Sequence, residues 1–381
     1  MSELNIYFVI GEQSGDDLGA DLLPVLQERA AGRGQAIRAS GLAGPKLKEL
    51  GVDSLFDIEE IAVMGLSAVA ARLPKIIRRV YQTVDDIVSA DPDLIVLIDS
   101  PDFTHAVAKR VRKRAPHIPV VDYICPSVWA WRSGRAAKMS AYIDHVLAIL
   151  PFEPQVLGEL GGPKATYIGH PLARRIEKLE PGPTELSEKP TLLVLPGSRS
   201  SEIKRLIDPF REAVGHLHRM GQPFEAVMPT LPHLRDELAR KVEDWPVHVE
   251  IVDSANNDET FSRAHAALAA SGTVALQLAL HRVPMTLAYR LDPVARQFMF
   301  LISSWSAALP NLIAGWPVVP EAFNDQISPE RMARMLRRLL NDTPERAAQL
   351  AGFDAVANEM RTRERPAERA ADVIFDLIGS K

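Results

Sequence analysis

Cysteine is scarce in this chain of 381 residues, which contains Cys125 and no other. A single cysteine cannot form an internal disulfide, so the sequence favours a reducing compartment. We interpret Cys125 as a small buried hydrophobic residue at a strand end rather than as a catalytic thiol. A large excess of one charge sign is also missing, because the formal net charge is −5. The sequence therefore gives no sign of a general nucleic-acid binder.

Long uninterrupted apolar runs are missing as well. The first six residues show no basic segment followed by an apolar core, so we expect no secretory signal and a cytoplasmic location. The uncharged stretch 297–320 is long enough to cross a bilayer, but prolines, serines, Asn311 and Gly315 interrupt it. We therefore reject a transmembrane helix in this stretch.

Short apolar runs alternate with helical stretches along the chain, which is typical of parallel α/β layers. In the first half, the predicted strands are residues 6–10, 36–40, 94–98, 120–124, 146–148 and 166–168, and the predicted helices are 17–30, 66–90, 104–114 and 134–142. In the second half, the predicted strands are residues 191–195, 225–228, 248–252, 267–270 and 285–288, and the predicted helices are 202–220 and 273–280.

The length exceeds the size at which one core usually keeps growing, so two domains are expected. A proline-rich stretch without apolar pattern separates the two halves. We predict a first domain at 1–172, a linker at 173–190, a second domain at 191–340 and carboxyl-terminal helices at 341–381. The sequence does not decide whether these helices pack back on the first domain. The fold class is two Rossmann-like, doubly wound α/β domains that face one another across a cleft, with ligands at the carboxyl ends of the strands.

Two loops of the second half have the composition of anion-binding turns. In the stretch Thr191-Leu-Leu-Val-Leu-Pro-Gly-Ser-Arg-Ser-Ser-Glu-Ile203, a buried strand enters a turn and then a helix. Gly197 allows close approach beside Ser198, and Arg199 carries a guanidinium suited to phosphate oxygens. A similar turn comes at Ser271, Gly272 and Thr273, before the helix 273–280. Together they predict a phosphorylated ligand, a nucleotide diphosphate.

Carboxylates follow the strands of the first half. Asp99 comes directly after the strand 94–98, whereas Asp102 fits a helix cap. Glu12, Ser14 and Asp16 follow the first strand and either contact the cleft or cap the next helix.

No cofactor is expected. The glycines at 11 and 15 do not match the dinucleotide fingerprint, so we set NAD aside. Asp91 and Asp93 mimic a metal-binding Asp-x-Asp motif but precede their strand, and we predict no metal.

Taken together, the loops resemble those of the lipid-A-disaccharide synthase family over nearly the whole chain. The segments that carry the resemblance are Gly11-Glu-Gln-Ser-Gly-Asp16, Ala62-Val-Met-Gly65, Ile98-Asp-Ser-Pro-Asp-Phe103, Cys125-Pro-Ser-Val-Trp-Ala-Trp-Arg132, Ile168-Gly-His-Pro171, Leu195-Pro-Gly-Ser-Arg199, Ala270-Ser-Gly-Thr273 and Leu309-Pro-Asn-Leu-Ile-Ala-Gly315. The Pro-Ser-Val-Trp-Ala-Trp and Leu-Pro-Asn-Leu motifs are the specific ones. The resemblance implies an inverting glycosyltransferase of the GT-B fold. Its donor would be UDP-diacylglucosamine, and its acceptor the 6-hydroxyl of diacylglucosamine 1-phosphate.

The resemblance also implies roles for single residues. It points to Asp99 as the base and to Met64 as an acceptor or cleft residue. It puts Asn311 in the active site, where the alternative is a turn residue after Pro310. Gln277 stands where the family usually carries a glutamate for the ribose, so the ribose contact is open. Arg199 is the candidate for the leaving diphosphate.

Acylated substrates imply contact with a membrane surface. The stretch 66–81 is apolar on one face with interspersed basic residues, and 109–114 forms a second basic run. Basic amphipathic segments suit anionic lipid surfaces, so we expect peripheral association with the cytoplasmic face of the inner membrane. Trp129 and Trp131 form either an acyl or sugar wall or part of the core. The sequence leaves the oligomeric state open, a homodimer included.

Two other functions remain open at this point. One is a UDP-sugar epimerase or hydrolase of the same fold. The uncharged stretch 297–320 disfavours it, because a purely water-soluble substrate would not require such a stretch. The other is a non-enzymatic two-domain ligand-binding protein. The absence of a signal segment and the presence of Asp99 and Arg199 in different halves disfavour it.

Overall fold

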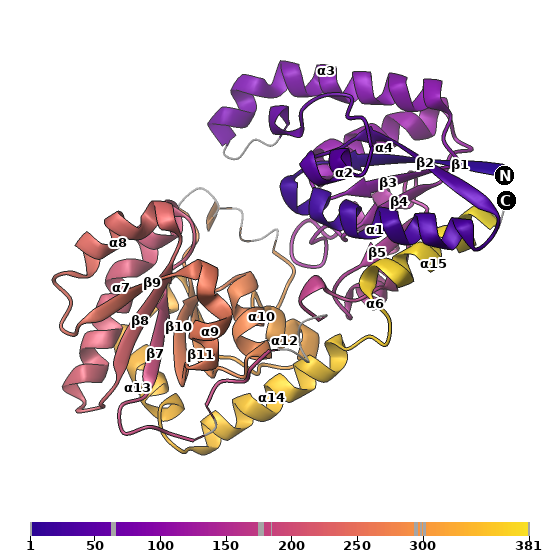
Figure 1. Cartoon of the computed structure of the whole chain (residues 1–381). Coiled ribbons are helices and arrows are strands. Elements are labelled where there is room, and N and C mark those ends of the chain that lie inside the picture. Colours follow the sequence, from indigo (N-terminus) through magenta and orange to yellow (C-terminus); the bar gives the residue numbers. More distant parts are fainter. Residues whose placement is uncertain are drawn as a thin grey trace. The chain divides into compact units, whose positions relative to one another are not determined.

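The computed structural model describes residues 2–61, 66–173, 179–183, 185–292, 296–297, 299 and 302–379. It contains two compact units (Figure 1). The first unit is formed by Met1–Pro171 together with Thr362–Lys381, and the second by Leu172–Arg361. The chain therefore passes from one unit to the other twice.

The first unit is built on a six-stranded parallel sheet in the order β2-β1-β3-β4-β5-β6. Its strands are β1 (Ser2–Ile10), β2 (Gln35–Leu42), β3 (Leu94–Ile98), β4 (Val120–Tyr123), β5 (His145–Ala148) and β6 (Lys164–Tyr167). Its helices are α1 (Gln13–Ala31), α2 (Pro45–Glu49), α3 (Leu66–Ala90), α4 (Pro101–Arg114), α5 (Arg135–Met139), α6 (Glu153–Glu159) and α15 (Pro366–Gly379). The strands and long helices expected from the sequence are confirmed to within a few residues.

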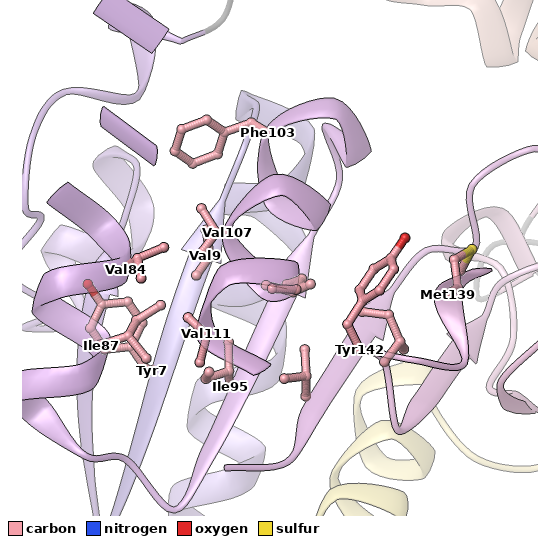
Figure 2. Close-up of a cluster of buried hydrophobic side chains, with 14 of the residues drawn as sticks. Tyr7, Val9, Val84, Ile87, Ile95, Phe103, Val107, Val111, Met139 and Tyr142 are labelled. Carbon is pink, nitrogen blue, oxygen red and sulfur yellow. The ribbon is translucent and has the colours of Figure 1, made fainter. Parts of the chain in front are cut away.

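Alternate residues of the central strands face opposite layers of helices, as the period of two in a strand requires. Tyr7 and Val9 of β1 point to the face covered by α3 and α4, and Ile6 and Phe8 point to the face covered by α1 and α15. Figure 2 shows the first of these cores, in which side chains of β1 and β3 meet those of α3 and α4. Because both faces are buried, β3 reads as an unbroken apolar run.

Helix α15 belongs to the first unit although it lies at the end of the chain. It runs beside α1 (Figure 1) and buries Ala370, Ala371, Ile374 and Phe375 in the core on that face of the sheet. Arg29 of α1 pairs with Asp372 at 3.4 Å. The first unit therefore needs the last helix of the chain to close its core.

The second unit repeats the plan with a parallel sheet in the order β12-β11-β10-β7-β8-β9. Its strands are β7 (Thr191–Leu195), β8 (Glu225–Thr230), β9 (Val249–Asp253), β10 (Ala266–Ala270), β11 (Met285–Tyr289) and β12 (Glu321–Phe323). Its helices are α7 (Ser200–Arg219), α8 (Arg235–Val242), α9 (Asn257–Ser262), α10 (Thr273–Leu280), α12 (Leu309–Ala314), α13 (Pro329–Leu339) and α14 (Pro344–Met360). The predicted pair of doubly wound parallel sheets is confirmed.

The carboxyl-terminal helices are divided between the units. Helix α14 joins the second unit, where the Gln349 side chain exchanges two hydrogen bonds with the backbone of Met285 at 2.8 and 2.9 Å. Phe353 of α14 is fully buried in the same core. The chain then returns to the first unit, where a Cβ on Gly169 would lie 3.0 Å from the Thr362 hydroxyl. The outgoing and returning segments therefore lie side by side there.

The uncharged stretch 297–320 holds the short helix α12 among its described residues. Across the part of the chain that the structure describes, no helix is long and apolar enough to cross a membrane.

Candidate active site

Each sheet has one point where neighbouring strands are connected in opposite directions, and ligands of open α/β sheets bind at the carboxyl ends of the strands there. In the first unit this point lies between β1 and β3, and in the second unit between β7 and β10. Glu12 and Ser14 follow β1, and Asp99 follows β3. Arg199 follows β7, and Ser271 follows β10. The topology therefore brings the predicted residues to the two switch points.

The loops after β1 and β3 touch directly. The Ser14 hydroxyl donates a hydrogen bond to Asp99 Oδ2 at 2.6 Å, and the Gly11 N–H donates to the Ile98 carbonyl at 3.1 Å. A Cβ on Gly11 would lie 2.1 Å from the Cβ of Ser100, so this approach requires glycine. Ser14 therefore helps to orient the carboxylate of Asp99, although the two residues are 85 positions apart in the sequence.

Asp99 stands on a strained turn. Asp99 and Ser100 have φ values of 63° and 45°, in the left-handed region that non-glycine residues seldom adopt. The Ser100 N–H donates to Asp99 Oδ1 at 2.8 Å, and the Thr104 hydroxyl donates to the Asp99 carbonyl at 3.0 Å. Consecutive strained residues of this kind concentrate at functional sites. Asp99 lines a small cavity of about 160 Å³ together with Asp122, Cys125 and Ser127.

A buried polar chain lies behind this cavity, which the sequence analysis missed. His105 Nε2 and Asp122 Oδ2 are 2.9 Å apart, and both side chains are 2% exposed. The Tyr142 hydroxyl, seen in Figure 2, lies 3.3 Å from His105 Nδ1. The contact between His105 and Asp122 could not be predicted from the sequence, because it depends on how helix α4 packs against strand β4.

The sequence predicts for Asp16 either a cleft contact or a cap on the helix that follows it, and in the structure its partners lie in another helix. Asp16 is fully buried, and its carboxylate accepts hydrogen bonds from the N–H groups of Gly44, Lys46 and Leu47 at 2.8 to 3.2 Å. These groups open helix α2, so Asp16 caps that helix from a distance. Glu12 precedes α1 and is half-buried. Met64 lies outside the described residues.

The two tryptophans of the 125–132 loop have different environments, because the backbone turns there instead of running extended. Trp129 packs edge-on against Phe152, and its indole N–H donates to Glu153 Oε1 at 3.2 Å. Trp131 is 37% exposed. Burial raises the pKa of Glu153 to about 7, against the opposing effect of its hydrogen bonds. Cys125 is buried, which raises the pKa of its thiol well above the usual range.

The other two carboxylates of interest in the first unit have structural partners. Asp93 accepts a hydrogen bond from the Asn5 N–H at 2.8 Å, and Asp91 pairs with His117 at the same distance. Both lie at the amino end of β3, away from the switch point.

The second unit has a pocket of about 530 Å³ at its switch point. Its lining includes the residues predicted to bind the donor or the leaving diphosphate, which are Gly197, Ser198, Arg199, Ser271, Gly272, Thr273 and Gln277. Helices α7 and α10 both begin at this pocket, and neither has a side-chain cap, since Arg199 before α7 makes no cap hydrogen bond and Gly272 before α10 has no side chain. Two helix amino termini with backbone N–H groups thus open at one pocket, an arrangement that favours an anion.

Three further lining residues were missed from the sequence. Glu202 accepts a hydrogen bond from the Ser198 N–H at 3.2 Å and pairs with Arg199 at 3.4 Å. Tyr289 contributes an aromatic ring at the end of β11. Asn257 has a buried Oδ1 to which no described residue donates a hydrogen bond. The sequence did contain an indication of Glu202, since a glutamate three residues after the residue that precedes a helix is part of a capping pattern.

Asn311 has a structural role in the second unit, and its predicted place in the active site stays a prediction. It is 2% exposed and does not line the pocket. Its amide nitrogen donates to the Val319 carbonyl at 2.9 Å, and its oxygen accepts from the Val319 N–H at 2.7 Å. The same nitrogen also reaches Ser306 and Glu321. With its polar atoms used this way, Asn311 holds the chain before β12 to helix α12.

Comparison with known proteins shows which of the functions compatible with this geometry the chain has. Residues 6–375 match the family model described as lipid-A-disaccharide synthetase. The lipid-A-disaccharide synthase of Rhodopseudomonas palustris strain HaA2 is 45% identical over 380 residues, which cover 98% of this chain and 96% of that protein. The synthase of Nitrobacter winogradskyi is also 45% identical, over 98% of this chain and 95% of its own.

The chain belongs to the lipid-A-disaccharide synthase family. It is therefore a glycosyltransferase of lipid A biosynthesis, and the family reaction condenses UDP-diacylglucosamine with diacylglucosamine 1-phosphate. The predicted enzyme class and activity are confirmed. This membership also removes the epimerase, hydrolase and ligand-binding alternatives.

Solved structures show that the synthase fold is shared beyond the family. The chain resembles a glycosyltransferase of kitacinnamycin with a TM-score of 0.59 at 14% identity, covering 99% of this chain and all of the other. It resembles the UDP-GlcNAc 2-epimerase of Neisseria meningitidis bound to UDP-GlcNAc with a TM-score of 0.55 at 13% identity, covering both chains fully. At such identities the likeness concerns the GT-B fold alone.

Proposed function

We propose that the pocket of the second unit binds the UDP part of the donor and that Asp99 of the first unit is the catalytic base. The observation that carries this proposal is the pocket at the β7/β10 switch point. It gathers two open helix amino termini, a glycine turn and the Arg199 guanidinium. These groups hold the diphosphate and stabilise the charge that develops as it departs. Ser271 and Thr273 contribute hydroxyls, and Gln277 offers its amide to the ribose.

Asp99 suits the role of base because its carboxylate is oriented on both sides. Ser14 and the Ser100 N–H each hold one oxygen, and the turn that carries them is strained. In the proposed step, Asp99 takes the proton of the acceptor 6-hydroxyl. The hydroxyl oxygen forms a bond to the anomeric carbon, whose bond to the phosphate oxygen breaks. UDP leaves with that electron pair, and the anomeric configuration inverts.

We also assign the membrane contact to helix α3. Its exposed apolar side chains come at every fourth residue, namely Leu73, Ile77 and Tyr81, which are 45% to 51% exposed. Arg72 and Arg78 are exposed among them, and Lys75 is exposed but pairs with Glu60. Such a helix suits an anionic bilayer surface, and in this proposal that surface is the cytoplasmic face of the inner membrane.

The second basic run is less available to lipid than the sequence implied. Arg112 pairs with Asp144, and Arg114 pairs with Asp85. Lys109 stacks on the ring of Tyr142, and burial lowers its pKa. Helix α3 is therefore the stronger candidate for the membrane contact.

A turnover assay that follows UDP release tests the proposed chemistry. Release should require both lipid substrates. Asp99→Asn should lower kcat by about a hundredfold or more, because the amide cannot take the proton. The matched control is Asp102→Asn, three residues later with a 99% exposed side chain, which should leave kcat near the wild-type value. A near-normal rate in Asp99→Asn would remove Asp99 as the base.

A further inference from the structure

Glu202 is a charged residue of the donor pocket that the proposed function does not use. It lies in the first turn of α7, and its side chain folds back over the turn that precedes the helix. One carboxylate oxygen accepts the Ser198 N–H at 3.2 Å, and the other pairs with Arg199 Nη1 at 3.4 Å. This single carboxylate thus engages both a backbone donor and the cation that the proposed function assigns to the diphosphate.

The carboxylate is packed against the turn rather than extended into solvent. A Cβ on Gly197 would lie 2.7 Å from Glu202 Cβ and 2.8 Å from its Oε2. The Glu202 side chain is 25% exposed, whereas that of Arg199 is 66% exposed. Because Gly197 has φ of 125° and no side chain, the turn leaves room for an anion at this position, and Glu202 fills it.

The charges of the pocket point to competition. Among the described residues that line it, Arg199 and Glu202 are the ones with a formal charge, so the two cancel. A diphosphate brings at least two further negative charges. If Glu202 stayed on Arg199, the diphosphate would face a like charge across the same N–H and guanidinium, which is unfavourable at this separation.

We propose that Glu202 is a built-in competitor for the diphosphate of the donor. It occupies the Ser198–Arg199 turn until the diphosphate displaces it on binding. This inference rests on the proposed donor site. It makes the pocket selective, because a highly charged diphosphate outcompetes the carboxylate at Arg199, whereas an uncharged nucleoside does not.

Calorimetric titrations of the full-length protein with UDP and with uridine test the inference. Glu202→Gln keeps the size of the side chain and removes its charge. It should bind UDP about fivefold more tightly than the wild type, the effect of one partly exposed charge, and should leave uridine binding unchanged. Glu202→Asp retains the charge and should not reproduce the gain. Glu243→Gln removes an exposed charge outside the pocket and should bind like the wild type.

The outcomes separate this inference from the proposed function. If the wild type binds UDP and folded Glu202→Gln binds it equally or more weakly, the competitor role is overturned while the donor site stands. If neither protein binds UDP, the donor site itself fails, and the inference fails with it. Thermal unfolding reports whether each variant is folded. Should Glu202→Gln be unfolded, the same titrations on Glu202→Ala decide.

Discussion

Single residues in this enzyme carry tasks that their type alone does not reveal. Asp16, Asp99 and Asp102 are all aspartates near strand ends. Asp16 is buried under three backbone N–H groups, Asp99 sits strained beside Ser14, and Asp102 is exposed. Asp16 is fully buried with three of its acceptor sites used by backbone donors, so a substrate cannot reach it. The surroundings of each carboxylate, and not its position after a strand, therefore distinguish Asp99, the proposed base, from Asp16, the helix cap.

Asn257 gives a residue-scale prediction in which stability and binding change in opposite directions. No described residue donates a hydrogen bond to its buried oxygen, which costs stability and can accept a hydrogen bond from a ligand. We expect Asn257→Leu to raise the free energy of unfolding by about 1 kcal/mol and to weaken UDP binding by about tenfold. Thermal unfolding and calorimetry measure the two effects. A less stable variant with unchanged UDP affinity would contradict the assignment.

Glu153 gives a pH-dependent prediction. Its pKa in the folded protein is raised from the usual 4.5 to about 7 by burial, so folding favours the protonated form. Its contribution to stability is present below pH 4.5 and is lost as the pH rises through 7. Between pH 6 and pH 8 the loss is about 1 kcal/mol. Glu153→Gln cannot ionise, so its melting temperature should fall less over this interval. An equal fall in both proteins would show that Glu153 does not titrate as described.

At the scale of elements, helix α3 shows how one helix serves two surroundings. Val80, Val84 and Ile87 face the core, and Leu73 and Ile77 continue the same apolar face towards the amino end of the helix, where they are exposed. A helix that only covered a sheet would need no apolar stripe beyond its buried part. The exposed continuation of the stripe is what supports the membrane assignment.

Charged substitutions in that exposed part of the stripe should weaken lipid binding. We expect Leu73→Asp with Ile77→Asp to lower binding to vesicles of anionic phospholipid by at least about tenfold, since two apolar side chains lose their burial in the bilayer. Vesicle sedimentation measures the binding. Leu50→Asp is the matched control, because Leu50 is also an exposed leucine of the first unit, at 41%, but lies at the end of α2. Equal loss in the control variant would point to general repulsion by added charge and not to docking through α3.

At the scale of the whole molecule, two units with their own cores should unfold as two units. Calorimetry of the full chain should therefore resolve two transitions. UDP should raise the unfolding temperature of the second unit only. The free energy of unfolding of that unit should increase by about 2.7 kcal/mol when UDP is in hundredfold excess over its dissociation constant. A shift of both transitions together would show that the units unfold as one.

Removal of α15 tests the divided carboxyl terminus. A chain that ends at Arg361 lacks the buried Ile374 and Phe375, and such losses cost several kcal/mol each, comparable with the stability of a domain. The transition of the first unit should collapse, and that of the second should persist. A chain that ends at Gly379 keeps α15 and is the control. Loss of the second transition instead would contradict the division.

The amino-acid pattern determined the α/β class, nearly every strand and long helix, and the loops that carry the donor residues. It could do so because burial on both faces leaves β3 and β7 as continuous apolar runs, and because glycine turns such as the one at Gly197 are local features. It could not reveal α15 closing the first unit, the His105–Asp122 pair or the amide of Asn311 turned inward. Those depend on which side chains long-range packing brings together, and on which polar atoms are used up by backbone groups far away in the chain. Tertiary structure alone decided them, since hydrogen-bond partners are a property of space and not of sequence order.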